Sequence, residues 1–148
     1  MNPISVIIHH SIYINKPKNV VWDFTQDYDN RNRWDSSVLE AKVLQIFPNR
    51  IVKLKMKSNT EMTFIYKLDD KPNKTTLAAT EIQSPIIEAA GGSWSYVEQN
   101  NGTLWSQTNT IIFKKNFLSF LLLPFYKFVF TRLTKQAMQK AKKLIEKS

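Results

Sequence analysis

The chain has 148 residues, of which 43% are apolar and 12% aromatic, so we expect one domain, residues 1–148, with a substantial core. The absence of cysteine excludes a disulfide framework, a thiolate nucleophile and a cysteine-based zinc site. The net charge of +9 comes almost wholly from residues 101–148, which hold nine Lys and Arg and one acidic residue, whereas residues 1–100 hold twelve basic and eleven acidic residues.

The first part of the chain predicts a strand followed by two short helices. Residues 4–14 are mostly β-branched or aromatic, which is typical of a strand. Pro17 ends this stretch and suits the first turn of a short helix. Asp27 or Asp29 can cap a second short helix, which we expect over about residues 28–35.

A series of strands in hairpin order follows. The connections are short and rich in Pro, Asn, Asp and Gly, and they separate residues 38–47, 50–57, 61–68, 75–83, 87–98 and 103–114. Connections this short imply antiparallel neighbours. Gly91 and Gly92 lie inside one stretch, where paired glycines indicate a bulge or a sharp bend. A bend of this kind would let the sheet curl around a helix.

The last third of the chain predicts one long cationic helix. Apolar residues recur there at spacings of three and four, which places them on one helical face: Tyr126, Phe130, Leu133, Ala137, Ala141 and Leu144. Residues 117–122 begin the helix, and Pro124 either lies in its first turn or kinks it. We therefore predict an α+β fold in which a curved antiparallel sheet of six or seven strands wraps around a long C-terminal helix and encloses a cavity.

Two groups of residues carry a family resemblance. Residues 12–24 with Arg33-Trp34-Asp35 form an opening pattern, and residues 94–98, Asn101-Gly102-Thr103 and residues 140–145 form a closing pattern. Together they resemble the polyketide cyclase/dehydrase and lipid-transport superfamily, whose START-like (SRPBCC) members have a helix-grip fold. The resemblance implies that fold over nearly the whole chain. It implies no particular activity, because members include ligand carriers, cyclases, dehydratases and partner-binding modules.

Alternation along the strands predicts which side chains face the helix. The inward set comprises Val52, Leu54, Met56, Met62, Phe64, Tyr66, Leu68, Trp94 and Tyr96. The last strand has two registers, and we choose the one with Trp105, Gln107 and Asn109 because it holds the larger apolar groups and matches the family pattern. Buried amides need hydrogen-bond partners, so Gln107 and Asn109 bond one another, Tyr66, trapped water or a ligand.

These side chains define a candidate ligand site. Its members are Trp34, Phe64, Tyr66, Trp94, Tyr96, Trp105, Gln107, Asn109, Tyr126, Phe130 and Leu133. Aromatic and aliphatic residues in such positions are more often core than ligand contacts. Trp34 either covers one mouth of the cavity or plugs the core beneath it. The leading hypothesis is carriage or sequestration of a hydrophobic or amphipathic small molecule or lipid.

An enzyme of the cyclase or dehydratase type is the alternative hypothesis, and it needs a titratable group inside the cavity. Glu81, Tyr66 or a histidine would have to serve, and Glu81 would be the best general acid or base if it faced inward, although the outer face is the commoner place for a glutamate. His9 and His10 are adjacent on a strand and point to opposite faces, so they cannot jointly bind one metal. We name no catalytic residue, metal or cofactor.

The basic tail and the apolar residues 117–130 support a third hypothesis, an interaction with an anionic membrane surface or a protein partner. This apolar stretch is shorter than the roughly twenty residues that span a bilayer, and Pro124 and Lys127 interrupt it, so we expect no transmembrane helix. We do not expect nucleic-acid binding, because no recognised motif accompanies the charge. The N-terminal residues show no signal-peptide pattern, and we expect a cytoplasmic protein.

Overall fold

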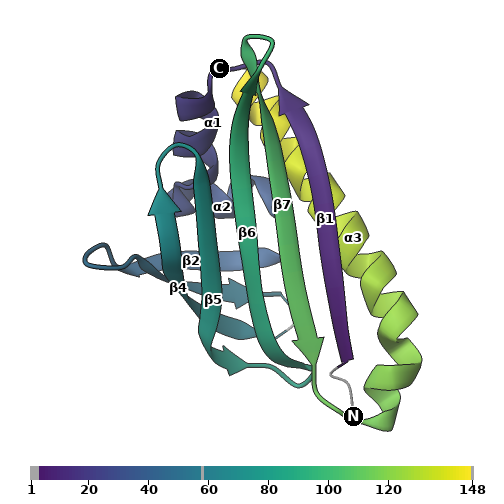
Figure 1. The fold of residues 1–148 in the computed structure, drawn as a ribbon. Helices are drawn as coiled ribbons and strands as arrows, with labels where there is room; N and C mark the ends of the chain where they lie inside the picture. Colours follow the sequence, from purple (N-terminus) through teal and green to yellow (C-terminus); the bar gives the residue numbers. More distant parts are fainter. Residues whose placement is uncertain (1–3, 58, 148) are drawn as a thin grey trace.

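The computed structural model describes residues 4–57 and 59–147. Its elements follow the predicted order, with one strand, three short helical segments, six further strands and a long helix (Figure 1). Their bounds are β1 Ile4–Ile14, α1 Lys18–Thr25, the 3-10 helix η1 Tyr28–Asn30, α2 Arg31–Trp34, β2 Val38–Gln45, β3 Ile51–Met56, β4 Glu61–Asp70, β5 Lys74–Gln83, β6 Ile87–Gln99, β7 Gly102–Phe113 and α3 Phe117–Glu146.

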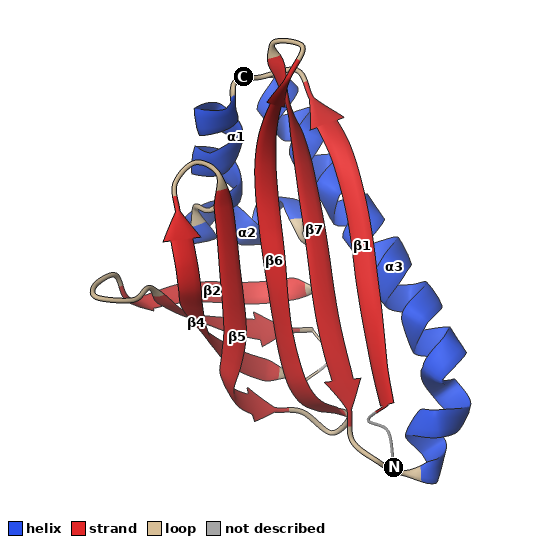
Figure 2. Ribbon diagram, in the orientation of Figure 1, coloured by secondary structure: helices blue, strands red, loops and turns tan. Residues whose placement is uncertain are grey.

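All seven strands belong to one antiparallel sheet in the order β1-β7-β6-β5-β4-β3-β2. The first strand therefore lies beside the last one, and the other strands follow as hairpin neighbours. In Figure 2 the C-terminal half of α3 lies behind β6, β7 and β1, whereas its N-terminal half extends beside the edge strand β1. The predicted α+β helix-grip architecture is confirmed, with seven strands.

The two halves of the sheet separate at the middle of β6. Strand β5 pairs with β6 only as far as Ala78 and Gly91, whereas β6 stays paired with β7 as far as Ile87. Beyond Gly91 the strands β2 to β5 turn away from β6, β7 and β1, as Figure 1 shows. Because of this divergence, the two half-sheets are not hydrogen-bonded to each other beyond Gly91, and a space opens between them on the concave face.

Of the two features predicted at the paired glycines of β6, a bulge or a sharp bend, the bulge is not found there. Both pair with β7 in regular register, and the register shift lies instead between Ile87 and Ala89. Gly92 is required by close approach, because a Cβ atom there would lie 2.5 Å from the Asn109 Oδ1 atom. The absence of a side chain at this position therefore makes room for an amide on the concave face.

The largest cluster of buried side chains lies where the C-terminal half of α3 meets the sheet. Ala137 and Ala141 of the predicted helical stripe are buried there, and Met138 and Ile145 widen the buried face. The cluster also contains Ile14, Val21, Trp22, Trp34, Trp94, Tyr96 and Trp105. The small alanines let α3 approach the aromatic side chains closely, so this half of the helix is fixed to the sheet.

The predicted inward register holds in β3, β6 and β7 and fails at the end of β4. Phe64 and Tyr66 are buried as expected, but Leu68 is 42% exposed. A register shift between Tyr66 and Leu68 turns the end of the strand over, so that Leu68 reaches the outer surface. The prediction that Leu68 faces inward was therefore wrong, because strict alternation does not continue to the end of β4.

Candidate functional site

A cavity of about 510 Å³ lies between the diverging halves of the sheet and the middle of α3, residues 125–137. Its wall is mostly apolar, with side chains such as Leu54, Phe64, Ile87, Ile111 and Phe130. Its volume lies within the range of roughly 300 to 1,000 Å³ that is typical of small-molecule sites. The arrangement can enclose the apolar part of one small molecule.

Eight of the eleven residues predicted for the ligand site line this cavity: Trp34, Phe64, Trp94, Gln107, Asn109, Tyr126, Phe130 and Leu133. The other three, Tyr66, Tyr96 and Trp105, lie outside its wall. Trp105 is fully buried, and its ring centroid lies 5.6 Å from that of Trp34 and 6.3 Å from that of Tyr96. These three side chains face inward but are covered by others, because strand alternation identifies the inward face and not the part of it that borders the cavity.

A chain of side-chain hydrogen bonds runs along the wall from β6 to β7. The Trp94 Nε1–H group donates to Asn109 Oδ1 at 3.3 Å, and Asn109 Nδ2 donates to Gln107 Oε1 at 3.0 Å. The two amides thus bond one another, which was one of the predicted alternatives. Gln107 is buried and lines the cavity, and its Nε2 group makes no hydrogen bond to another described residue. That group can donate to a ligand oxygen.

Arg31 of α2 places a positive charge in the cavity wall. Its Nε–H group donates to an Asp35 carboxylate oxygen at 3.0 Å, and the two side chains are only 12% and 13% exposed. The guanidinium lies 4.8 Å from the ring centroid of Trp34 and 5.0 Å from that of Trp94. No hydrogen bond joins its terminal Nη groups to another described residue. These donors can hold an anionic or strongly polar ligand end.

The surroundings of Arg31 stabilise its positive charge. Burial lowers the pKa of the Arg31 guanidinium, but the Asp35 carboxylate and the phenols of Tyr28 and Tyr66 raise it by more, and the pKa lies above its ordinary value. The Asp35 carboxylate also accepts from the Ser37 hydroxyl at 2.6 Å and from the Ser37 backbone N–H at 3.2 Å. These hydrogen bonds fix Asp35, and Asp35 in turn holds the Arg31 guanidinium in place.

Sequence reasoning missed Arg31 and Asp35 as site residues. The available signal was their four-residue spacing with Trp34 between them, which puts all three on one side of a helical turn. The turn is only four residues long, so it carries no apolar periodicity that would show its orientation. Tertiary packing against the aromatic residues of the sheet turns this side toward the cavity.

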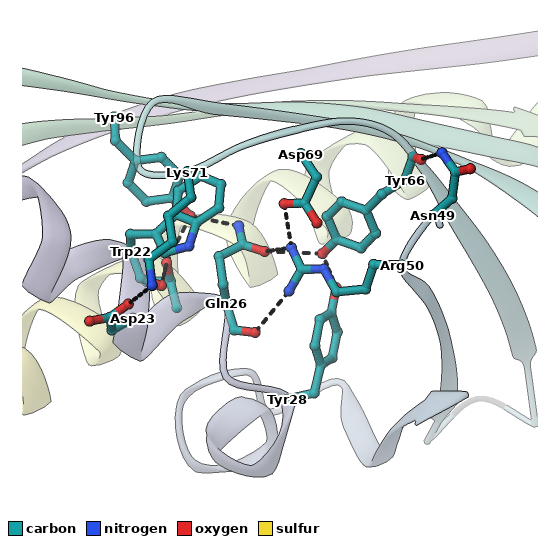
Figure 3. A network of polar contacts seen from close by, with 11 residues as sticks. Trp22, Asp23, Gln26, Tyr28, Asn49, Arg50, Tyr66, Asp69, Lys71 and Tyr96 are labelled. Carbon is teal, nitrogen blue, oxygen red and sulfur yellow. Dashed lines mark hydrogen bonds and ion pairs between the residues drawn. The ribbon is translucent and has the colours of Figure 1, made fainter. Parts of the chain in front are cut away.

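A second polar cluster lies behind Tyr28, which lines the cavity (Figure 3). The hydroxyl groups of Tyr28 and Tyr66 are hydrogen-bonded, and Tyr66 also donates to Gln26 Oε1 at 3.1 Å. Arg50 Nη2 donates to the same Gln26 oxygen at 2.7 Å, and its guanidinium lies 3.9 Å from the Tyr66 ring centroid. Gln26 Nε2 donates to the Tyr96 hydroxyl at 2.8 Å. Gln26 therefore fixes the side chains of Tyr66 and Tyr96 in the core.

Tyr66 and Tyr96 are neutral at ordinary pH. Burial raises the pKa of the Tyr66 phenol well above its usual value, and burial also raises the pKa of the Tyr96 phenol. Glu81, the other candidate acid or base, is exposed on the outer face, as the sequence favoured. Among the described residues that line the cavity, Asp35 is the one carboxylate, and Arg31 engages it. The arrangement can bind and orient a ligand.

No family model and no curated protein matches this sequence. Among solved structures, TTHA0849 from Thermus thermophilus matches with a TM-score of 0.81 and 13% identity over 95% of this chain and 97% of that one. The Zhui aromatase/cyclase from Streptomyces sp. R1128 matches with a TM-score of 0.81 and 14% identity over 96% of this chain and 94% of that one. The chain has the START-like helix-grip fold.

A further START-like structure, Ara h 8.0201, matches with a TM-score of 0.72 and 8% identity over 97% of this chain and 99% of that one. The matches cover nearly all of each chain, which confirms the predicted helix-grip fold. At these identities the likeness shows the fold alone. The residues of the cavity, and not the fold, therefore indicate what this protein binds.

Proposed function

We propose that this START-like protein binds one amphipathic small molecule, with an apolar chain or ring system in the cavity and an anionic or strongly polar end at Arg31. The observation that carries the proposal is a largely apolar cavity of about 510 Å³ whose wall contains one guanidinium with free terminal donors among the described residues. Sites for small molecules typically combine such apolar walls with a few polar groups that fix orientation.

The polar groups of the wall converge around Trp94. Arg31 lies over its ring, Asn109 accepts from its indole N–H group, and Gln107 is its cross-strand partner. A ligand head in this region would meet the Arg31 and Gln107 donors together. The apolar remainder would lie against the other walls, where each 100 Å² of apolar surface removed from water contributes roughly 2.5 kcal/mol. Apolar burial thus supplies affinity, and the donors supply orientation.

The test is a displacement titration with cis-parinarate, a fluorescent carboxylate. Trp34 and Trp94 line the cavity, so energy transfer from tryptophan reports its occupation. We expect saturable binding of one parinarate per chain and its displacement by dodecanoate. The proposal would be contradicted if energy transfer did not saturate as parinarate is added, or if dodecanoate did not displace the bound parinarate.

A matched pair of variants on β6 locates the binding. Ala90 lines the cavity, whereas its neighbour Ala89 does not. Ala90→Leu should weaken parinarate binding, because the larger side chain occupies cavity volume. Ala89→Leu, a change of the same size on the same strand, should leave binding unchanged. Equal effects from the two variants would place the ligand elsewhere.

Cyclase-type chemistry on a poly-β-ketone is the second candidate. The Tyr28 phenol and the Arg31 guanidinium both line the cavity and could hydrogen-bond a carbonyl or enolate oxygen. The fold shared with the Zhui aromatase/cyclase supports the same candidate. Incubation with a poly-β-ketone thioester tests it by product analysis. A product mixture identical to that formed in buffer alone would reject it.

A further inference from the structure

The side of α3 that faces away from the sheet carries a continuous exposed stripe. Its members recur every three or four residues and are all exposed: Phe117, Leu121, Phe125, Phe128, Arg132, Lys135, Gln139 and Lys143. We call this set the outward stripe. Its first four side chains are apolar and are between 57% and 77% exposed, and its last four are polar or cationic. Exposed apolar side chains in such a contiguous row mark an interaction surface.

The opposite side of the same helix is held on the sheet. The Phe113 ring of β7 stacks on Tyr126 and Phe130 with centroid distances of 4.8 and 6.1 Å. By length and composition alone α3 could cross a membrane, with a mean hydropathy of 1.3 over its most apolar window. However, its C-terminal half is packed into the core through Ala137 and Ala141. The geometry therefore suits a helix that lies on a surface more than one that spans it.

The charges around the outward stripe have one sign. Lys114, Lys115, Lys127, Arg132 and Lys135 lie on or beside its apolar half, and no acidic residue occurs between residues 114 and 145. Pairing two copies through this stripe would bring their cations together, which opposes self-association. A shallow hollow on this side is lined by Lys127, Arg132 and Lys135 together with Pro124, Phe128, Thr131 and Gln136. These features complement an anionic lipid surface.

We propose that the apolar half of the outward stripe docks into the interface of an anionic bilayer, with Lys127, Arg132 and Lys135 at the lipid headgroups. Helices with an aromatic apolar face and flanking basic residues bind membranes in this orientation, through apolar burial and attraction to anionic lipid. The packed side of α3 keeps the helix parallel to the surface while the rest of the fold stays outside the bilayer.

The docking surface adjoins the cavity. Phe125 belongs to the outward stripe, is 60% exposed and also lines the cavity, and Val129 lines it one turn further on. Docking would therefore bring one end of the cavity to the lipid surface, where an amphipathic ligand enters or leaves. This second step rests on the proposed function, whereas docking itself does not depend on it.

The experiment measures co-sedimentation of the protein with phosphatidylcholine vesicles that contain or lack phosphatidylglycerol, at several salt concentrations. We expect binding that requires phosphatidylglycerol and weakens as salt rises. Changing Phe117, Leu121 and Phe128 together to Ser should reduce binding by about tenfold or more, because apolar burial is lost. The matched control changes Leu44 and Val97 to Ser, since these are exposed apolar side chains on other elements. It should bind like the parent protein.

A Lys127→Gln, Arg132→Gln, Lys135→Gln variant should lose both affinity for phosphatidylglycerol vesicles and salt dependence. Circular dichroism of every variant verifies that it is folded. Binding that is absent, or that ignores lipid charge and salt, would overturn the proposal. So would a dimer in sedimentation velocity that the Ser variant dissociates. Docking is measured without dodecanoate and cavity binding without vesicles, so failure of one is distinguishable from failure of the other.

Discussion

Arg31→Gln should weaken binding of a charged ligand far more than binding of its neutral analogue. The guanidinium makes one hydrogen bond to Asp35 and leaves its terminal donors for the cavity. A hydrogen bond to a charged group is worth about 1.5 to 3 kcal/mol. Its loss corresponds to a decrease in affinity of roughly 10- to 150-fold for dodecanoate. Dodecanol has no charge to lose, so its affinity should fall by less than about threefold.

The assay is displacement of parinarate by each of the two ligands from parent and variant. The change also leaves Asp35 without its cation, and breaking a buried ion pair costs about 3 to 5 kcal/mol at most. Urea unfolding therefore accompanies the titration, and the Arg31→Gln, Asp35→Asn variant removes both charges. We expect it to recover stability without recovering the preference for dodecanoate. An equal loss of affinity for both ligands in Arg31→Gln, or a preference for dodecanoate that returns in the double variant, would show that Arg31 does not bind the charged end of the ligand.

Three further predictions concern the supporting structure. Gln26→Leu removes the hydrogen bonds of Gln26 to Tyr66, Arg50 and Tyr96 and should lower the free energy of unfolding, measured in a urea titration, by about 2 to 4 kcal/mol. The control Gln139→Leu, at an exposed position, should change it by less than about 0.5 kcal/mol. Burial raises the pKa of the Tyr66 and Tyr96 phenols, so the native state keeps protons that the unfolded chain loses near pH 10. The stability that these two phenols contribute is therefore fully present below about pH 10, and above it the free energy of unfolding falls by about 1.4 kcal/mol per pH unit for each phenol. A Tyr66→Phe, Tyr96→Phe variant should show a smaller slope. Gly92→Ala should destabilise by about 1 to 3 kcal/mol in thermal unfolding, because the new methyl group collides with an amide of β7; an unchanged melting temperature would contradict the close approach.

The strands and the long helix were predictable because local pattern determines them. A run of β-branched and aromatic residues gave the first strand its observed bounds, Ile4–Ile14, and a three-and-four spacing gave the buried face of α3. Leu68 is an exception, since a register shift reverses the end of β4 and no residue type marks it in advance. Elements are thus readable from sequence where one periodicity persists over several residues.

The site was predictable only in part, because its limits depend on which short elements cover the sheet. Tyr66 and Tyr96 face inward as alternation requires, but Gln26 and the other residues of the segment after β1 pack over them. Arg31 reaches the cavity from a helix of a single turn, where no periodicity exists to reveal its direction. These assignments require the tertiary arrangement.

The apolar segment at the start of α3 shows a related difficulty. Sequence identifies residues 117–130 as strongly apolar, and this composition suits a buried helix as well as a surface-active one. The sheet covers only one side of α3, so Tyr126 and Phe130 pack against it while Phe117 and Phe128 face outward. The structure is therefore needed to tell the apolar residues of α3 that pack on the sheet from those that face outward, because the two kinds alternate every few positions.

Native mass spectrometry of the protein mixed with dodecanoate shows whether the cavity is a specific ligand site. We expect a single added mass that corresponds to one dodecanoate per chain and disappears when the protein is denatured. Ala90→Leu should lose this complex, and Ala89→Leu should keep it. A spectrum that shows only the free chain at every dodecanoate concentration, or multiple adducts that both variants retain, would contradict the assignment of the cavity as a specific ligand site.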